Sequence, residues 1–266
     1  LQGGTPEYNM PMAFEVQGLL NLSLLTKVFS EILTRHEVLR TVYVEDEGEA
    51  KQRIRPMSEL QFRIDEIDLS HLTDESQLNE VSEYVKADII APFDLANDVM
   101  VRVSYLHTAK DAGVLVFNMH HIASDGWSME VLTNEFFALY EAFSQGKPSP
   151  LPDIEIQYVD YAHWQRTHLE KEVLDKQLDY WVKQLDEAPP AHSLPLSYSR
   201  PETKAHVGAV VRGSLSADVS KKLQTLAKQH QLTPFMLLHG ALSLLLSRHS
   251  NSQDIVIGTP VANRMQ

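Results

Sequence analysis

The stretch "NMHHIASDGW", residues 118–127, follows the apolar run "GVLVF" and leads into a segment with helical spacing. Neighbouring side chains of an extended segment point to opposite faces, so His120 and His121 cannot share one role. Asp125 follows His121 by four residues and has two possible roles: it can lie beside that histidine or cap the next helix. Gly126 is expected to relieve a turn that a side chain would hinder. The stretch therefore predicts a strand, a tight turn and a helix.

Three interpretations of these histidines compete: a catalytic base, a metal site, or local packing with hydrogen bonds. A metal site needs at least three converging ligands, and His121 with Asp125 supplies two. The other candidates, His107, His163 and His168, have no ligand spacing, and no HExxH segment occurs. We therefore expect no metal. A serine hydrolase would need a G-x-S-x-G elbow, which is also missing. The local motif leaves a catalytic base and simple packing open.

The remaining elements indicate a mixed α/β protein. Strands are expected at 12–16, on both sides of an acidic turn at Asp46–Glu49, at 99–105, 113–119 and 207–215, and within 254–264. Helices are expected at 22–33, before Pro92, at 129–143, 158–185, 217–229 and 235–248. Four prolines fall in the segment "APPAHSLPLSYSRPETKAH". We therefore expect a first lobe at 1–185, a linker at 186–206 and the start of a second lobe at 207–266.

The composition excludes several kinds of binding partner and reactive group. A formal net charge of −13 argues against nucleic acid or an anionic membrane surface as a partner. There are no cysteines, which excludes disulfides and a thiol nucleophile. The apolar run Phe235–Ser247 is too short to span a bilayer, so we expect a buried helix there. No signal-peptide pattern is seen and no Met opens the chain, so we expect a cytoplasmic piece of a longer protein.

The histidine motif and several other segments together resemble one family. "MHHIASDGWS" matches the HHxxxDG signature of the condensation domains of nonribosomal peptide synthetases. The segments "RHEVLRTVY" (35–43), "YVDYAHWQ" (158–165) and "DIVIGTPVANR" (254–264) resemble further motifs of that family, in the same order. "YNMP" followed by "GLLNLSLL" resembles its opening. The resemblance covers nearly the whole chain.

The resemblance implies a fold similar to chloramphenicol acetyltransferase, with two αβ lobes and the histidine motif in a tunnel between them. The family's later motifs have no counterpart before Gln266, so the second lobe is expected to be incomplete in this chain. We therefore expect this piece alone to be inactive.

The implied reaction is amide bond formation between a donor aminoacyl or peptidyl thioester and the amine of an acceptor aminoacyl thioester. His121 matches the family's active-site histidine, and we expect it to accept a hydrogen bond and a proton from the attacking amine. The backbone N–H of Gly126 is a candidate oxyanion donor. His120 is expected on the packing side, and Trp127 is expected in either the core or the tunnel wall.

Asp125 is expected to be structural, bridged to an arginine of the second lobe. Arg264 is the matching candidate, and Arg35 and Arg40 are alternatives. All three would belong to the structure of the active site rather than to its chemistry.

The implied partners are donor and acceptor carrier proteins and an adjacent adenylation domain. We expect no cofactor on the domain itself, because phosphopantetheine on the carriers holds the substrates. The motif favours an L-configured donor. The alternatives are an epimerization domain, another HHxxxDG acyltransferase, and a non-catalytic relative that recruits partners.

Overall fold

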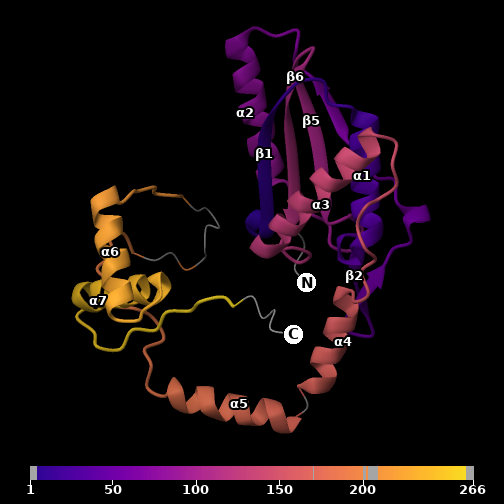
Figure 1. The fold of residues 1–266 in the computed structure, drawn as a ribbon. Coiled ribbons are helices and arrows are strands. Elements are labelled where there is room, and N and C mark those ends of the chain that lie inside the picture. The colour runs from indigo at the N-terminus through magenta and orange to yellow at the C-terminus, as the bar shows by residue number, and fades with distance from the viewer. Residues whose placement is uncertain (1–4, 170, 200–201, 203–208, 262–266) are drawn as a thin grey trace. The chain divides into compact units, whose positions relative to one another are not determined.

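The computed structural model describes residues 5–169, 171–199, 202 and 209–261. It divides into two compact units, Leu1–Glu170 and Lys171–Gln266. The described residues of the first unit form six strands and four α-helices, most of which are labelled in Figure 1. The strands are β1 (Asn9–Gln17), β2 (Thr41–Asp46), β3 (Glu49–Ile54), β4 (Asp65–Asp68), β5 (Val101–Ala109) and β6 (Ala112–His120). The helices are α1 (Leu22–Arg35), α2 (Asp74–Ile90), α3 (Gly126–Ser144) and α4 (Tyr158–His168).

A four-stranded sheet in the order β1-β6-β5-β4 forms the centre of the first unit. β1 and β5 pair with β6 in antiparallel fashion, and β4 pairs with β5 in parallel. The second sheet is the hairpin β2-β3, with the expected acidic turn between Asp46 and Glu49. Glu47 and Gly48 of this turn have φ values of 53° and 81°. A positive φ is favourable for glycine, which explains why Gly48 is the second residue of this two-residue turn.

Helices cover both faces of the four-stranded sheet (Figure 1). Val103 of β5 and Phe117 of β6 join the large core under α1 and α3. Leu106 lies three residues after Val103 on β5, and Val116 lies one residue before Phe117 on β6. Both therefore point to the opposite face, where they join the smaller core under α2. This alternation places every second side chain of β6 on the same face, so Asn118 and His120 lie toward α2.

The sequence expectation is correct for most helices and only partly correct for the strands. Asn21 caps α1, its side chain accepting a hydrogen bond from Leu24 N at 3.0 Å. The segment "HTAKDAG" was expected to separate two strands, but only Lys110 and Asp111 lie between β5 and β6. Its other residues, except Thr108 at a shift in register, pair across the hairpin, because the sheet supplies hydrogen bonds that a local pattern does not reveal. The helical region expected at 158–185 is interrupted after His168.

The second unit contains the helices α5 (Lys171–Gln184), α6 (Ala217–Gln229) and α7 (Pro234–Ser250). The strands expected at 207–215 and within 254–264 are wrong for their described parts, 209–215 and 254–261, which contain no strand. A strand needs a hydrogen-bonding neighbour, and no described segment of this unit provides one.

The expected buried helix at α7 is also wrong, since none of its described residues is buried. Phe235 and Leu244, for example, are 59% and 60% exposed. Ala227 of α6 is the one buried apolar side chain among the described residues of this unit. An apolar helix is stable in water only when another surface covers it, and α6, which contacts α7, leaves much of α7 exposed.

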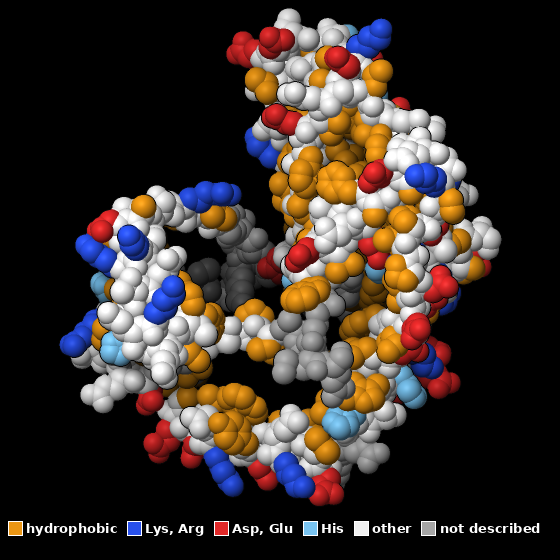
Figure 2. All heavy atoms as spheres, in the orientation of Figure 1, with side chains coloured by type: hydrophobic (Ala, Val, Ile, Leu, Met, Phe, Trp, Pro, Cys, Tyr) orange, Lys and Arg blue, Asp and Glu red, His pale blue; other side chains and the backbone are white. Residues whose placement is uncertain are grey.

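Charged side chains are spread over the first unit, and hydrophobic side chains reach its surface between α2 and α3 (Figure 2). The exposed ones on β1 and α3 include Phe14 and Phe137, which are 44% and 65% exposed. Among the described residues, no helix combines the length and apolar character needed to cross a membrane.

Candidate active site

The histidine motif lies where β6 ends and α3 begins. His120 is the last residue of β6 and is 5% exposed, whereas His121 begins the turn and is exposed. The alternation of side chains along the strand accounts for this difference, since it points His120 into the layer under α2. The two rings therefore lie in different environments, one dry and one open to solvent.

His120 is held by rings and by the turn that follows it. Its ring lies 6.0 Å from that of Tyr8 and 5.7 Å from that of Phe93, the latter edge-on at 81°. Its Nδ1 accepts a hydrogen bond from Ile122 N at 3.0 Å. Burial, together with the neighbouring His121, lowers the pKa of His120, which keeps the ring neutral. A neutral ring with its proton on Nε2 is the form that this hydrogen bond requires.

Backbone hydrogen bonds fix the turn that carries His121. His121 N donates to Tyr8 O at 2.8 Å, and Ala123 N donates to His120 O at 3.0 Å. Ser124 Oγ also donates to His120 O, at 3.0 Å. The turn is thus tied both to the start of β1 and to the end of β6.

Asp125 caps α3. Its Oδ1 accepts hydrogen bonds from Ser128 N at 2.8 Å and from Ser128 Oγ at 2.6 Å, while Ser128 Oγ accepts one from Asp125 N at 3.2 Å. This reciprocal capping box satisfies amide groups that the first turn of a helix leaves without partners. Of the two roles left open by the sequence, capping is therefore the one that these contacts support.

Gly126 is the first residue of α3, and the expectation that it relieves a strained turn is wrong. A Cβ at this position would meet no atom within 4 Å, and the φ of Gly126 lies outside the left-handed region. The glycine therefore leaves open space beside the turn rather than permitting an unusual backbone. Its N–H belongs to the first turn of α3, where amides have no acceptor within the helix.

The arginines considered as partners of Asp125 are engaged elsewhere or lie outside the description. Arg35 binds Glu135, with Nη2–Oε1 at 3.1 Å, and donates to Pro152 O at 2.7 Å. Arg40 donates to Leu33 O, to Arg55 O and to Glu37. The expectation that either one pairs with Asp125 is thus wrong, because Arg35 pairs with Glu135 and Arg40 pairs with Glu37 and with a carbonyl near the end of α1. Arg264 lies outside the described residues.

The "RHE" segment instead ties α1 to α3 and α4, a role that the sequence analysis missed. Arg35 Nε and His36 Nε2 both reach Glu135 Oε2 on α3, at 3.3 and 2.7 Å. Gln157, which caps α4, donates to Arg35 O at 2.8 Å and accepts from Glu37 N at 3.1 Å. Burial raises the pKa of Glu135, but hydrogen bonds from His36 and Arg35 outweigh it and lower that pKa to about 2. No spacing rule joins residues a hundred positions apart, so only the fold reveals this contact.

Trp127, the second residue of α3, is 58% exposed and is not a core residue. Trp127 and Gly126 both belong to the first turn of α3. Of the two positions considered for it, the core is therefore wrong, and the tunnel wall stays a prediction.

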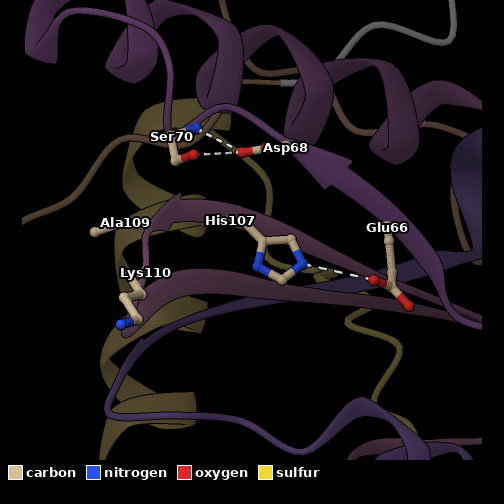
Figure 3. Close-up of a pocket in the computed structure, with 6 residues that line it drawn as sticks. All are labelled: Glu66, Asp68, Ser70, His107, Ala109 and Lys110. Carbon is tan, nitrogen blue, oxygen red and sulfur yellow. Dashed lines mark hydrogen bonds and ion pairs between the residues drawn. The ribbon is translucent and has the colours of Figure 1, made fainter.

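No group of three or more His, Asp or Glu residues within the described part of the chain gathers as metal ligands would. A hollow of about 330 Å³ lies at the other end of the sheet, where β4 and β5 end (Figure 3). Glu66, Asp68, Ser70, His107, Ala109 and Lys110 line it. Within it, Ser70 Oγ donates to Asp68 at 2.6 Å and His107 Nε2 lies 3.7 Å from Glu66. The Ser70 hydrogen bonds lower the pKa of Asp68. These groups pair with one another, and none belongs to the histidine motif.

Comparison with known proteins identifies the family to which the chain belongs. The model of the condensation domain family matches residues 1–266. The chain belongs to the condensation domain family. Condensation domains are enzymes of the acyltransferase type, so the exposed histidine of the HHxxxDG motif lies in a chain whose family performs acyl transfer.

The relatives of this condensation domain are parts of peptide synthetases. The chain is 40% identical over 257 residues to one protein of the linear gramicidin synthase of Brevibacillus parabrevis, covering 97% of this chain and 3% of that protein. It is 35% identical over 264 residues to phosphinothricin tripeptide synthetase PhsC of Streptomyces viridochromogenes, covering 99% of this chain and 24% of the relative. The condensation domain thus spans a small part of the curated relatives it matches.

Solved structures have the same fold. The chain superposes on the four-domain nonribosomal peptide synthetase holo-AB3403, bound to AMP and glycine, with a TM-score of 0.82 at 27% identity, over 98% of this chain and 19% of that one. The X-domain from teicoplanin biosynthesis superposes with a TM-score of 0.79 at 23% identity, over 93% of this chain and 53% of that one. The expected mixed α/β condensation-domain fold is therefore confirmed.

Proposed function

We propose that this condensation domain joins a donor aminoacyl or peptidyl thioester to the amine of an acceptor aminoacyl thioester, each held on the phosphopantetheine of a carrier protein. The observation that supports this most directly is the exposed His121 beside the N-terminus of α3. A base and a set of amide donors at one place are what an acyl transfer through a charged tetrahedral intermediate requires.

In the proposed reaction the acceptor nitrogen attacks the thioester carbonyl and forms the new C–N bond. His121 accepts the hydrogen bond of the attacking amine and takes its proton as the tetrahedral intermediate forms. The C–S bond then breaks, and the departing thiolate is protonated by the imidazolium. Because an α-amine with a pKa near 8 is already partly neutral at pH 7, holding the reacting atoms in line contributes much of the rate.

Gly126 is proposed to donate its N–H to the carbonyl oxygen as negative charge develops there. The N-terminus of a helix favours such charge, although the carboxylate of Asp125 occupies part of the same field. Asp125 holds the start of α3 in place through Ser128, and Arg264 is the proposed second partner of its carboxylate. The donor is proposed to be L-configured, and an adjacent adenylation domain is proposed to load the acceptor carrier.

The test is a coupling assay on the full-length protein that carries this chain, with both carriers loaded. His121→Ala is compared with wild type and with His107→Ala, a control histidine near the opposite end of the same sheet. We expect dipeptidyl thioester on the acceptor carrier from wild type and the control, and a loss of at least about a hundredfold with His121→Ala.

Carrier binding by His121→Ala should stay within about twofold of wild type, because the ring is proposed to act on the reacting atoms. Equal loss of coupling and carrier binding would contradict the catalytic role. A donor that changes configuration without transfer would identify an epimerization domain. No reaction from an intact wild-type protein would leave partner recruitment as the function.

A further inference from the structure

A partly buried polar network anchors the C-terminal end of α2 to the sheet beside His120. Asn9, Arg102 and Asn118 extend from the adjacent strands β1, β5 and β6. Their donor atoms bind the last carbonyl oxygens of α2 and its C-terminal cap, which a helix cannot satisfy by itself. We call Asn9, Asp88, Arg102 and Asn118 the α2 anchor.

The anchor makes several hydrogen bonds to α2, while Asn9 Oδ1, Arg102 Nε and Asn118 Oδ1 have no hydrogen-bond partner among the described residues. Asn9 Nδ2 donates to Ile89 O and Ala91 O, both at 2.8 Å. Arg102 donates to Pro92 O at 3.0 Å, to Asp88 O at 3.2 Å and to Ala91 O at 2.8 Å. Asn118 Nδ2 donates to both the carbonyl and the carboxylate of Asp88, each at 2.9 Å. The side chain of Asp88 is 11% exposed and also lies 3.4 Å from Arg102 Nε.

The strand register places the anchor and His120 on one face of the sheet. Asn9 lies opposite His120, and Arg102 lies opposite Asn118. Residues opposite each other in an antiparallel pair point to the same face, and so do residues two apart on one strand. His120 is therefore a direct neighbour of the anchor, although it makes none of the anchor's hydrogen bonds.

Phe93 connects the anchor to His120. The guanidinium of Arg102 lies 4.0 Å from the centroid of the Phe93 ring, a cation–π contact, and Phe93 is fully buried. The same Phe93 ring makes the edge-on contact with His120 at 5.7 Å. The aromatic ring is therefore in contact with a fixed cation and with the first histidine of the motif.

His120 in turn holds the turn that carries His121. Its Nδ1 accepts the Ile122 N–H at 3.0 Å, so a rotation or shift of the His120 ring would release the backbone next to His121. His121 is the exposed member of the pair, and no hydrogen bond from a described residue reaches its ring. The position of that ring therefore depends on the backbone of the turn.

We propose that Arg102 and Phe93 are positioning residues of the condensation reaction, acting through the His120 ring and the Ile122 amide to hold His121 where it meets the attacking amine. This inference rests on the proposed function of His121. A misplacement of about 1 Å in a reacting group can lower a rate about a hundredfold, so a contact chain of this length can control kcat.

Phe93→Leu in the full-length protein tests the inference, with Phe29→Leu as a matched control. Phe29 is 2% exposed in α1, and its ring contacts Phe62 and Phe136 in the core on the other face of the sheet. Both substitutions remove a buried ring, so both should lower the melting temperature. We expect kcat of Phe93→Leu to fall about tenfold or more with KM for the acceptor carrier unchanged, and kcat of Phe29→Leu to stay within about twofold.

Arg102 supplies a second test that leaves Phe93 in place. Arg102→Gln should lower kcat as Phe93→Leu does, because it removes the cation over the ring and most of the carbonyl contacts. Arg102→Lys should recover part of kcat, since an ammonium can still lie over Phe93. Equal kcat values for Gln and Lys would argue against the role of the cation.

A double-mutant cycle separates positioning from general loss of structure. In a His121→Ala background, Phe93→Leu should cause no further loss of coupling, because the group that it positions is gone. A further tenfold loss in that background would overturn the inference. If His121→Ala abolishes coupling while Phe93→Leu behaves like Phe29→Leu, only the positioning inference fails. If His121→Ala couples normally, both this inference and the proposed role of His121 fail.

Discussion

Glu135 on α3 pairs with Arg35 at the end of α1 and with His36. The stability that these ion pairs contribute can be measured as a function of pH. The pKa of Glu135 is lowered from 4.5 to about 2 by His36 and Arg35, against the effect of burial. Such a shift corresponds to about 3 kcal/mol of preference for the charged form in the folded state, at about 1.4 kcal/mol per pKa unit. The carboxylate is 13% exposed. Since water screens part of the interaction, we expect about 2 kcal/mol for Glu135 in the charged form.

The sign of the pH dependence follows from the direction of the shift. A carboxyl group with a pKa below its unfolded value stabilises the folded state at pH values above 4.5, and this contribution disappears as the pH falls toward about 2. Glu135→Gln removes the titrating group but keeps its size. The variant should therefore be less stable than wild type by about 2 kcal/mol at pH 7, and the difference should narrow below pH 4.5.

The measurement is the urea unfolding free energy of the complete condensation domain at several pH values. Asp46→Asn is the matched control, because Asp46 pairs with Lys51 on the surface, where the side chains are 58% and 49% exposed. We expect it to change stability by less than about 0.5 kcal/mol at any of these pH values. A Glu135→Gln difference that is the same at pH 7 and pH 3, or no larger than that of the control, would refute the interpretation.

Four further substitutions at three positions test the local structure, each by thermal or urea unfolding. Asp125→Ala should destabilise by about 1–2 kcal/mol through loss of the α3 cap and Asp125→Ser by less, since serine also caps; equal losses would show that capping is not what Asp125 contributes to stability. Gly126→Ala should not destabilise, because a Cβ there meets open space, and an added helical alanine can increase stability by up to about 1 kcal/mol. Gly113→Ala should destabilise by at least about 2 kcal/mol, since its Cβ would lie 2.5 Å from Leu106 O and from the Tyr105 ring. Similar effects of the two glycine substitutions would contradict the packing described.

The elements around the motif could be predicted because their signals are local. Alternation along β6 was enough to expect different surroundings for His120 and His121. The start of α1 was also recognisable, because its apolar residues recur at helical spacing. The order of the family motifs was enough to expect the condensation-domain fold. In each case the information lies within a few residues or in a sequence pattern.

The contacts that support the motif could not be predicted in this way. Glu135 was not considered as the partner of Arg35, and nothing in the sequence joins Arg102, Phe93 and His120. Trp127 was expected in the core or the tunnel wall, and its local sequence could not exclude the core. The strands expected near the end of the chain depend on neighbours that the described residues do not provide.

The sequence by itself determined the class of this protein and the residues of its motif, because apolar periodicity, capping residues and motif spacing are properties of short segments. The family resemblance already implied that His120 lies on the packing side, and only the tertiary structure decided that Asp125 caps α3 through Ser128 and which arginines are already paired. These outcomes depend on which distant strands and helices meet. Burial and hydrogen bonding are properties of the whole packed unit, and no local pattern contains them.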